Sequence, residues 1–366
     1  MQTIISGKDS YKRIEEILNG LESKKFMLVC DSSFEFLSIK DYFNQIKIPF
    51  VRFSDFTPNP LYEDVVKGVE IFNNENCDAI VAVGGGSSLD VAKCIKLYSK
   101  LDGTKNYLTQ EYADTKIPLI ALPTTAGTGS ESTRFAVIYY EGKKQSVNHI
   151  SIIPNFAILE SSVLKTLPLY QKKCTLLDAL CQAIEAWWSV NSTDESKEYS
   201  KKAIEKITKN MKEYFLSPSE EVLSEIMLGA NFAGRAINIT QTTAAHAMSY
   251  KLTSLYKIPH GHAVAICLAP LFKFMSENID KCIDSRGEIY LQKTFEEISS
   301  CLGKSSVNGA IDWFFDFLKE IEIGSPEIKD EDLEILVSSV NVERLNNNPI
   351  KLTTQDLENL YKRIKA

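Results

Sequence analysis

The sequence comprises 366 residues, of which 44% are hydrophobic and 24% charged, with a net charge of −7. This composition is typical of a globular protein, the length predicts two domains, and the acidic balance argues against a nucleic-acid partner, which would need a basic face. No apolar run approaches the roughly 18 residues of a membrane span, so we expect no membrane partner.

Cysteine usage and the N-terminal residues predict a cytoplasmic protein. The N-terminus has no apolar stretch long enough for a signal peptide and is already charged at Lys8. The eight cysteines are scattered and contain no CxxC pair. We therefore expect reduced thiols, most of them in the core, rather than a disulfide framework.

Short apolar runs alternate with helix-like stretches through the first 160 residues. The runs cover residues 26–30, 48–53, 79–83 and 117–122. Uninterrupted apolar strands of this length suit a parallel sheet that is covered on both faces. The pattern predicts a doubly wound α/β domain, in which ligands bind beyond the carboxyl ends of the strands.

Two glycine-containing turns follow consecutive strands of this sheet. Residues 84–90, with Gly84, Gly85 and Gly86, lead from one strand into a helical stretch, where glycines and a helix start suit a pyrophosphate. Residues 123–131 follow the next strand with hydroxyls and two more glycines. Together the loops are suited to enclose a dinucleotide, although each alone is equally a tight turn or a surface loop.

Asp31 ends the first apolar run, and two interpretations of it remain open. Its carboxylate is placed to accept hydrogen bonds from an adenine ribose and to repel a 2′-phosphate, which favours NAD over NADP. Because Asp-Ser-Ser is also good capping chemistry, it is equally suited to begin a helix.

Helical periodicity dominates the chain from about residue 168. The helical segments are 176–188, 196–215, 220–239, 240–255, 263–275 and 311–321. Pro168 is the expected boundary, so we predict a dinucleotide-binding α/β domain over residues 1–167 and an all-helical domain over residues 168–366.

Three of the four histidines fall close together in the second half. His246 lies in a helical segment, His260 and His262 lie in a turn before the next one, and Asp178 and Gln182 share one face of an earlier helix. An aspartate inside so apolar a helix is costly to bury without a partner, and a divalent cation is one such partner. The alternative is that each histidine is an ordinary surface or hydrogen-bonded core residue.

Several segments resemble the iron-containing (group III) alcohol dehydrogenase family, in family order. They are TPNP (57–60), GGGSSLDVAK (84–93), TTAGTGSE (124–131), DALxxAIE (178–185) and PHG (259–261). The resemblance implies the dehydroquinate synthase-like fold, with NAD(P) bound by the N-terminal domain and one divalent metal, Fe²⁺ or Zn²⁺, by the helical domain. It also implies a homodimer.

Carried over by position, the resemblance assigns the metal to Asp178, Gln182, His246 and His260. The family usually has histidine at the position of Gln182, and an amide oxygen is a weaker ligand, so we expect reduced metal affinity or a different metal. Many members carry a histidine at the position of Tyr250, so proton delivery falls to the Tyr250 hydroxyl, to His262 or to water. For the dinucleotide the assigned residues are Asp31, Gly84, Gly85, Gly86, Ser87, Asp90, Thr124, Thr125, Thr128, Ser130 and Lys144.

A closer resemblance indicates the substrate. Residues 188–193 (WSVNST) and 260–262 (HGH) look like the branch that reduces phosphonoacetaldehyde to 2-hydroxyethylphosphonate. Because a phosphonate dianion needs cationic or multiple N–H partners, the candidates are Arg134, Arg235, Lys251 and His262, and each arginine or lysine is equally a solvated surface charge.

Three other functions remain open. The first is an alcohol dehydrogenase for an uncharged aldehyde or diol, such as lactaldehyde or butanal. The second is a sugar-phosphate cyclase or glycerol-phosphate dehydrogenase on a related scaffold. The third is an NAD-binding relative that has lost catalysis because Gln182 replaced a metal ligand.

Overall fold

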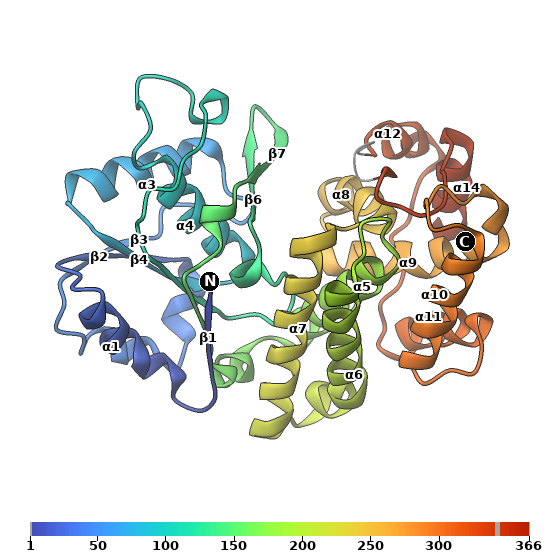
Figure 1. Ribbon diagram of the computed structural model, residues 1–366, viewed down its shortest axis with the longest axis horizontal. Coiled ribbons are helices and arrows are strands. Elements are labelled where there is room, and N and C mark those ends of the chain that lie inside the picture. The colour runs from blue at the N-terminus through green and yellow to red at the C-terminus, as the bar shows by residue number, and fades with distance from the viewer. Residues whose placement is uncertain (1, 341–344, 366) are drawn as a thin grey trace. The chain divides into compact units, whose positions relative to one another are not determined.

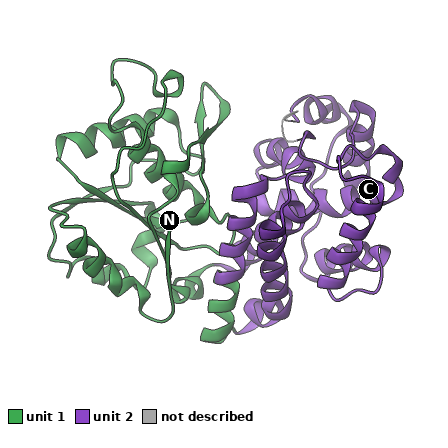
Figure 2. Ribbon diagram, viewed as in Figure 1, with its two compact units in different colours: residues 1–167, 218–227 green, residues 168–217, 228–366 purple. Residues whose placement is uncertain are grey.

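A computed structural model describes residues 2–340 and 345–365, and the chain divides into two compact units (Figures 1 and 2). The first unit contains residues 1–167 and 218–227, and the second contains residues 168–217 and 228–366. Residues 218–227 thus differ from the expected division, which placed them in the helical domain. An ion pair between Glu220 and Lys165 helps to hold this segment on the first unit.

The first unit is built on a six-stranded sheet in which every described pair of neighbours is parallel. The strands, in chain order, are β1 (Thr3–Ser6), β2 (Phe26–Cys30), β3 (Phe50–Phe53), β4 (Ala79–Gly84), β5 (Leu119–Pro123) and β8 (Phe156–Leu159). Their spatial order is β1-β8-β5-β4-β2-β3, and β2, β4 and β5 are buried along their whole length. The predicted doubly wound parallel sheet is confirmed.

Helices and one hairpin complete the first unit. The helices are α1 (Arg13–Gly20), α2 (Lys40–Phe43), α3 (Tyr62–Asn74) and α4 (Gly86–Tyr98), and the antiparallel hairpin is β6 (Phe135–Tyr140) with β7 (Lys143–Asn148). Helix α4 is buried on nearly every side because it packs against both the sheet and β6. The sequence analysis did not predict the hairpin, β1 or β8.

Among the described residues of the second unit, the regular elements are helices. The unit contains α5 (Leu169–Trp188), α6 (Asp194–Leu216), most of α7 (Glu220–Thr240), α8 (Ala244–Tyr256), α9 (His260–Glu277), α10 (Glu288–Cys301), α11 (Val307–Glu320), α12 (Leu333–Ser338) and α14 (Thr354–Lys365). Helix α5 is buried all round from residue 176 onward, because α6, α9 and α10 pack against it.

The helical pattern predicted from 220 to 255 is interrupted at Gln241, whose positive φ of 59° ends α7 before α8 begins. All eight cysteines are free and six are buried, as expected for reduced core thiols. Among the described helices, none combines the length and apolar character needed to cross a bilayer.

Candidate metal centre and glycine loops

Three side chains from three helices of the second unit form one cluster. Asp178 lies on α5, His246 on α8 and His260 at the first position of α9. Their ligand atoms all lie within 4.8 Å of one another, and Nε2 of His246 is 3.3 Å from Oδ1 of Asp178. One carboxylate and two imidazoles at this spacing form a donor set suited to a divalent cation. We call these residues the ligand cluster.

Gly261 explains how α9 brings His260 to this place. A Cβ atom at residue 261 would lie 1.9 Å from the carbonyl oxygen of Cys174 and 2.9 Å from Cβ of Asp178. Only a glycine therefore allows the first turn of α9 to contact α5 so closely. The PHG motif thus combines a ligand with the residue that permits its approach.

Gln182 lies one turn after Asp178 on α5 and is almost fully buried. Its amide hydrogen-bonds the Asp178 carboxylate, which is one of the interactions that lower the pKa of Asp178. The structure therefore places Gln182 beside the ligand cluster, where its amide group contacts a ligand directly.

The ligand cluster is strongly coupled electrostatically. Burial acts to lower the pKa of His246, but the neighbouring carboxylates of Glu185 and Asp178 outweigh burial and raise it to about 10. Burial acts to raise the pKa of Asp178, but the hydrogen bond from His246 and the charge of His260 lower it below its usual value. A cation that binds Nε2 of His246 must therefore displace a proton.

The two expected proton donors have different surroundings. The ring of Tyr250 stacks on His260 with the centroids 5.5 Å apart and the planes at 7°, so Tyr250 lies next to the ligand cluster. His262 instead donates from Nε2 to the carbonyl of Gly324 (2.7 Å) and accepts at Nδ1 from the hydroxyl of Tyr170 (2.8 Å). Burial lowers its pKa. With both nitrogens occupied, His262 connects α9 to two other segments, which does not fit the expected donor role.

The cations expected to bind a phosphonate have separate surroundings. Arg134 belongs to the first unit, and its guanidinium lies 5.4 Å from the ring centroid of Phe135. Arg235 lies on α7 with its guanidinium 5.5 Å from the ring centroid of Tyr199. Lys251 is half-buried on α8, immediately after Tyr250. Binding of a phosphonate by these cations stays a prediction.

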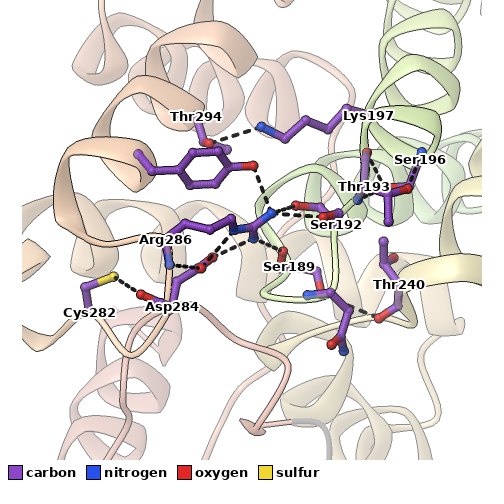
Figure 3. A network of polar contacts seen from close by, with 12 residues as sticks. Ser189, Ser192, Thr193, Ser196, Lys197, Thr240, Cys282, Asp284, Arg286 and Thr294 are labelled. Carbon is purple, nitrogen blue, oxygen red and sulfur yellow. Dashed lines mark hydrogen bonds and ion pairs between the residues drawn. The ribbon is translucent and has the colours of Figure 1, made fainter.

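The segment 188–193, which we associated with the substrate, is held by Arg286 (Figure 3). The guanidinium donates to the carbonyl oxygen of Ser189, to the carbonyl and hydroxyl oxygens of Ser192, and to both carboxylate oxygens of Asp284. These bonds fix the turn between α5 and α6. The structure therefore gives this segment a structural role, as the turn that Arg286 holds. The sequence analysis missed this role.

In the first unit the two glycine loops lie side by side. Gly84 has a φ of +156°, and a Cβ there would lie 2.3 Å from the hydroxyl of Ser88. Across the adjacent strand ends, the backbone N–H of Thr124 donates to the carbonyl of Gly84 (3.0 Å), and a Cβ at Gly86 would lie 3.0 Å from Cγ2 of Thr128. The expectation that both loops share one edge of the sheet is confirmed.

Asp31 makes two hydrogen bonds at this edge. One carboxylate oxygen accepts from the backbone N–H of Ser33 (2.7 Å) and so caps the short 3₁₀ helix η2 (Ser32–Phe36); the other accepts from the hydroxyl of Ser88 on α4 (3.0 Å). The capping interpretation is confirmed. Contact with an adenine ribose stays a prediction.

Asp90 and Ser130, both expected to contact the dinucleotide, bond to one another. The Ser130 hydroxyl donates to Asp90 (2.6 Å), whose other oxygen accepts from the backbone N–H of Val137 (2.9 Å). Lys93, which is fully buried, donates to three oxygens of residues 130–135, and burial lowers its pKa to about 8. These residues support the second loop. The sequence analysis did not select Lys93. The signal that identifies it is a lysine within an otherwise apolar helix.

Two of the other expected dinucleotide residues, Ser87 and Thr125, lie along the same loops, and Lys144 lies on the hairpin. Ser87, in the first turn of α4, accepts a hydrogen bond from the backbone N–H of Asn59 (3.4 Å). Thr125 packs at Gly85, within 3.7 Å of a Cβ built there, and Lys144 lies on β7. Their contact with a dinucleotide stays a prediction.

Family models match most of the chain. The model described as iron-containing alcohol dehydrogenase matches residues 2–161, and the model for the C-terminal part of the Fe-containing alcohol dehydrogenase family matches residues 173–365. Among individual proteins, alcohol dehydrogenase 4 of Schizosaccharomyces pombe is 31% identical over 83% of this chain and 73% of its own. The NAD-dependent methanol dehydrogenase of Bacillus methanolicus is 27% identical over 98% and 97%.

Solved structures show the same fold over the whole chain. Sulfoacetaldehyde reductase from Bifidobacterium kashiwanohense, in complex with NAD⁺, superposes with a TM-score of 0.89 at 26% identity and covers 100% of this chain and 97% of that one. A 1,3-propanediol oxidoreductase superposes with a TM-score of 0.89 at 24% identity, over 99% and 97% of the respective chains.

Proposed function

Because the chain belongs to the iron-containing alcohol dehydrogenase family, we propose that it reduces a small aldehyde to a primary alcohol, with a nicotinamide dinucleotide and one divalent metal ion. The observation that carries this proposal is the convergence of Asp178, His246 and His260 within 4.8 Å. When bound, the metal supplies a Lewis acid for a carbonyl oxygen, and the reduced nicotinamide supplies a hydride.

The residues present fit a divalent cation. Asp178 and His246 are each only 3% exposed, so these two ligands are shielded from bulk water, whereas His260 is half-buried. The pKa of Asp178 is lowered, which keeps its carboxylate ionised, as a ligand must be. Gln182 adds an amide beside Asp178, and three other ligands suffice for a catalytic site that keeps positions open.

Other side chains would bind, orient and deliver the proton. The turn before α4 and the loop at 124–128 offer backbone N–H groups and hydroxyls at a helix start, which suits a pyrophosphate. Asp31, at the end of β2, would favour NAD over NADP. Tyr250 lies beside His260, so its hydroxyl is our candidate to protonate the product oxygen, since His262 has both nitrogens occupied.

For the substrate we propose phosphonoacetaldehyde, reduced to 2-hydroxyethylphosphonate. Support comes from the resemblance of residues 188–193 and 260–262 to that branch, and from the likeness to sulfoacetaldehyde reductase, whose name also specifies a two-carbon aldehyde with an acidic group. An uncharged aldehyde is the second candidate. It is favoured by relatives named for methanol and butanol, and by the contacts that Arg235 makes with the ring of Tyr199 and His262 makes with the carbonyl of Gly324.

An aldehyde panel combined with elemental analysis tests both levels of this proposal. The purified chain should contain about one divalent metal ion per subunit and should oxidise NADH fastest, in kcat/KM, with phosphonoacetaldehyde. A preference for butanal or lactaldehyde would replace the substrate. A protein that binds NADH without metal or turnover would overturn the reductase function.

Replacement of His260 tests the metal site itself. His260→Ala removes one of the ligands of the cluster and leaves the glycine loops of the first unit intact. Turnover should therefore be lost while NADH binding, measured by fluorescence, persists. Wild-type turnover in this variant would refute the assignment.

A further inference from the structure

Glu185 is a fully buried carboxylate near the ligand cluster with no role in the function proposed above. It lies on α5, two turns after Asp178, and is 0% exposed. One of its oxygens, Oε2, bonds Nδ1 of His246. The other, Oε1, accepts from the Thr243 hydroxyl (2.7 Å) and from the backbone N–H groups of Ala245 (2.9 Å) and His246 (3.3 Å). Such a carboxylate is stable in the interior only because these donors satisfy it.

The bond to Nδ1 determines which nitrogen of His246 is available to a metal. The carboxylate of Glu185 accepts from three donors at Oε1 and is the acceptor at Oε2 as well, so Nδ1 is the donor of this bond and carries the proton. Without a metal, Nε2 donates to Oδ1 of Asp178, 3.3 Å away; once a cation displaces this proton, the lone pair of the neutral imidazole lies on Nε2. Glu185 therefore selects the tautomer that points a donor atom into the ligand cluster.

The same carboxylate fixes the backbone that carries His246. Thr243, the N-cap residue of α8, makes no side-chain cap of its own, and Oε1 of Glu185 accepts two N–H groups of the first turn instead. The indole N–H of Trp188 donates to the hydroxyl of Thr243 (2.9 Å), so this hydroxyl directs its own proton to Glu185. Trp188 and Glu185 both lie on α5. Helix α5 therefore binds the start of α8 through two side chains, an indole and a carboxylate.

His260 has a comparable support. The hydroxyl of Ser249 donates to the carbonyl of His246 (2.8 Å), and a hydroxyl has only one proton. At 3.4 Å from Nδ1 of His260 it must therefore accept. Both imidazoles thus have an acceptor at Nδ1, which favours Nε2 as the metal-binding atom of each.

We propose that Glu185 is a positioning residue of the metal centre, which holds His246 in the Nδ1–H tautomer with Nε2 turned toward the cation. The inference rests on the metal-binding function proposed above and deepens it. Hydrogen-bonded carboxylates behind ligating histidines fix the ring orientation, and their loss weakens metal binding by about 10–100-fold.

Glu185→Gln tests the inference with almost no change in volume. The amide oxygen can still accept from Thr243 and the α8 backbone, but the group facing Nδ1 becomes an NH₂ donor. Two donors cannot bond, so the imidazole must give up this contact or move its proton to Nε2. Moving the proton to Nε2 removes the lone pair, and breaking the contact leaves the ring without its support, so the affinity for Zn²⁺ should fall by about 10–100-fold.

The measurement is made on the full-length chain. Zn²⁺ affinity is obtained by competition with a chromophoric chelator, and the visible absorption of the Co²⁺-loaded protein reports coordination independently of turnover. Glu160→Gln is the matched control, because Glu160 is a 1% exposed carboxylate of the first unit that accepts from Ser10 and Ser162. It should retain wild-type Zn²⁺ affinity, and circular dichroism checks the fold of both variants.

A second measurement needs no variant. Because the chain has only four histidines, ¹⁵N-histidine labelling of the Zn²⁺-loaded wild type gives few signals. His246 should show a protonated Nδ1 and a metal-shifted Nε2, whereas coordination through Nδ1 would overturn the inference even if Glu185→Gln did not fold.

The outcomes separate the inference from the proposed function. A wild-type chain that binds neither Zn²⁺ nor Co²⁺ would refute the metal-dependent function itself. A wild-type chain that binds metal, with Glu185→Gln equal to it in affinity and Co²⁺ spectrum, would refute the role of Glu185 alone. An equal loss in Glu160→Gln would show a non-specific effect and would also refute it.

Discussion

Substitution of Gly261 by alanine should damage the metal centre through the backbone, without removing any ligand. The added Cβ would lie 1.9 Å from the carbonyl oxygen of Cys174, whereas ordinary contact needs about 3.4 Å. Helix α9 would therefore have to retreat from α5 by about 1.5 Å. Metal–ligand distances tolerate only about 0.2 Å, so His260, the adjacent residue, should no longer bind together with Asp178.

We expect Gly261→Ala to lose at least about 10-fold in Zn²⁺ affinity, which corresponds to about 1.4 kcal/mol of binding free energy. Overpacking should also cost about 1–3 kcal/mol of stability, lowering the unfolding midpoint of the metal-free protein. Chelator competition and thermal unfolding measure the two effects.

The matched control is Gly20→Ala. Gly20 is the last residue of α1, and a Cβ there would meet nothing within 4 Å, so both quantities should stay near those of the wild type. Wild-type metal affinity and stability in Gly261→Ala would contradict the close contact between α5 and α9.

Three further substitutions or conditions give distinct signatures. Gln182→His should tighten Zn²⁺ binding, because imidazole is a stronger ligand than an amide; unchanged affinity in chelator competition would show that residue 182 is not a ligand. Because the pKa of His246 is raised to about 10, Zn²⁺ must displace its proton, so affinity should rise with pH toward that value and fall on acidification. Calorimetry in buffers of different ionisation enthalpy should detect about one released proton, and a pH-independent affinity would count against the coupling. Asp31→Gly should raise the ratio of kcat/KM for NADPH to that for NADH, and an unaltered ratio would limit Asp31 to capping η2.

The sequence predicted those features that depend on neighbouring residues. Apolar runs identified β2, β4 and β5, because a strand buried on both faces needs apolar residues at every position, and a run over 48–53 also identified the edge strand β3. Helical periodicity likewise identified α5 through α9 and α11 in the second half. Shorter elements such as β1 and β8, of four residues each, carry too little pattern and form only because distant partners pair with them.

For the candidate site too, the sequence predicted what depends on residue type and local spacing. Residue types and local spacing, together with the family resemblance, sufficed to nominate Asp178, His246 and His260. Helical geometry alone placed Gln182 on the face of Asp178, since residues four apart share one side of a helix.

What the tertiary structure decided is how these groups meet and which groups hold them. The placement of Glu185 behind His246, the occupation of both nitrogens of His262, and the need for glycine at residue 261 all follow from contacts between segments far apart in the chain. Local pattern records which face of an element is buried, but hydrogen bonds and close contacts between elements exist only once those faces have packed.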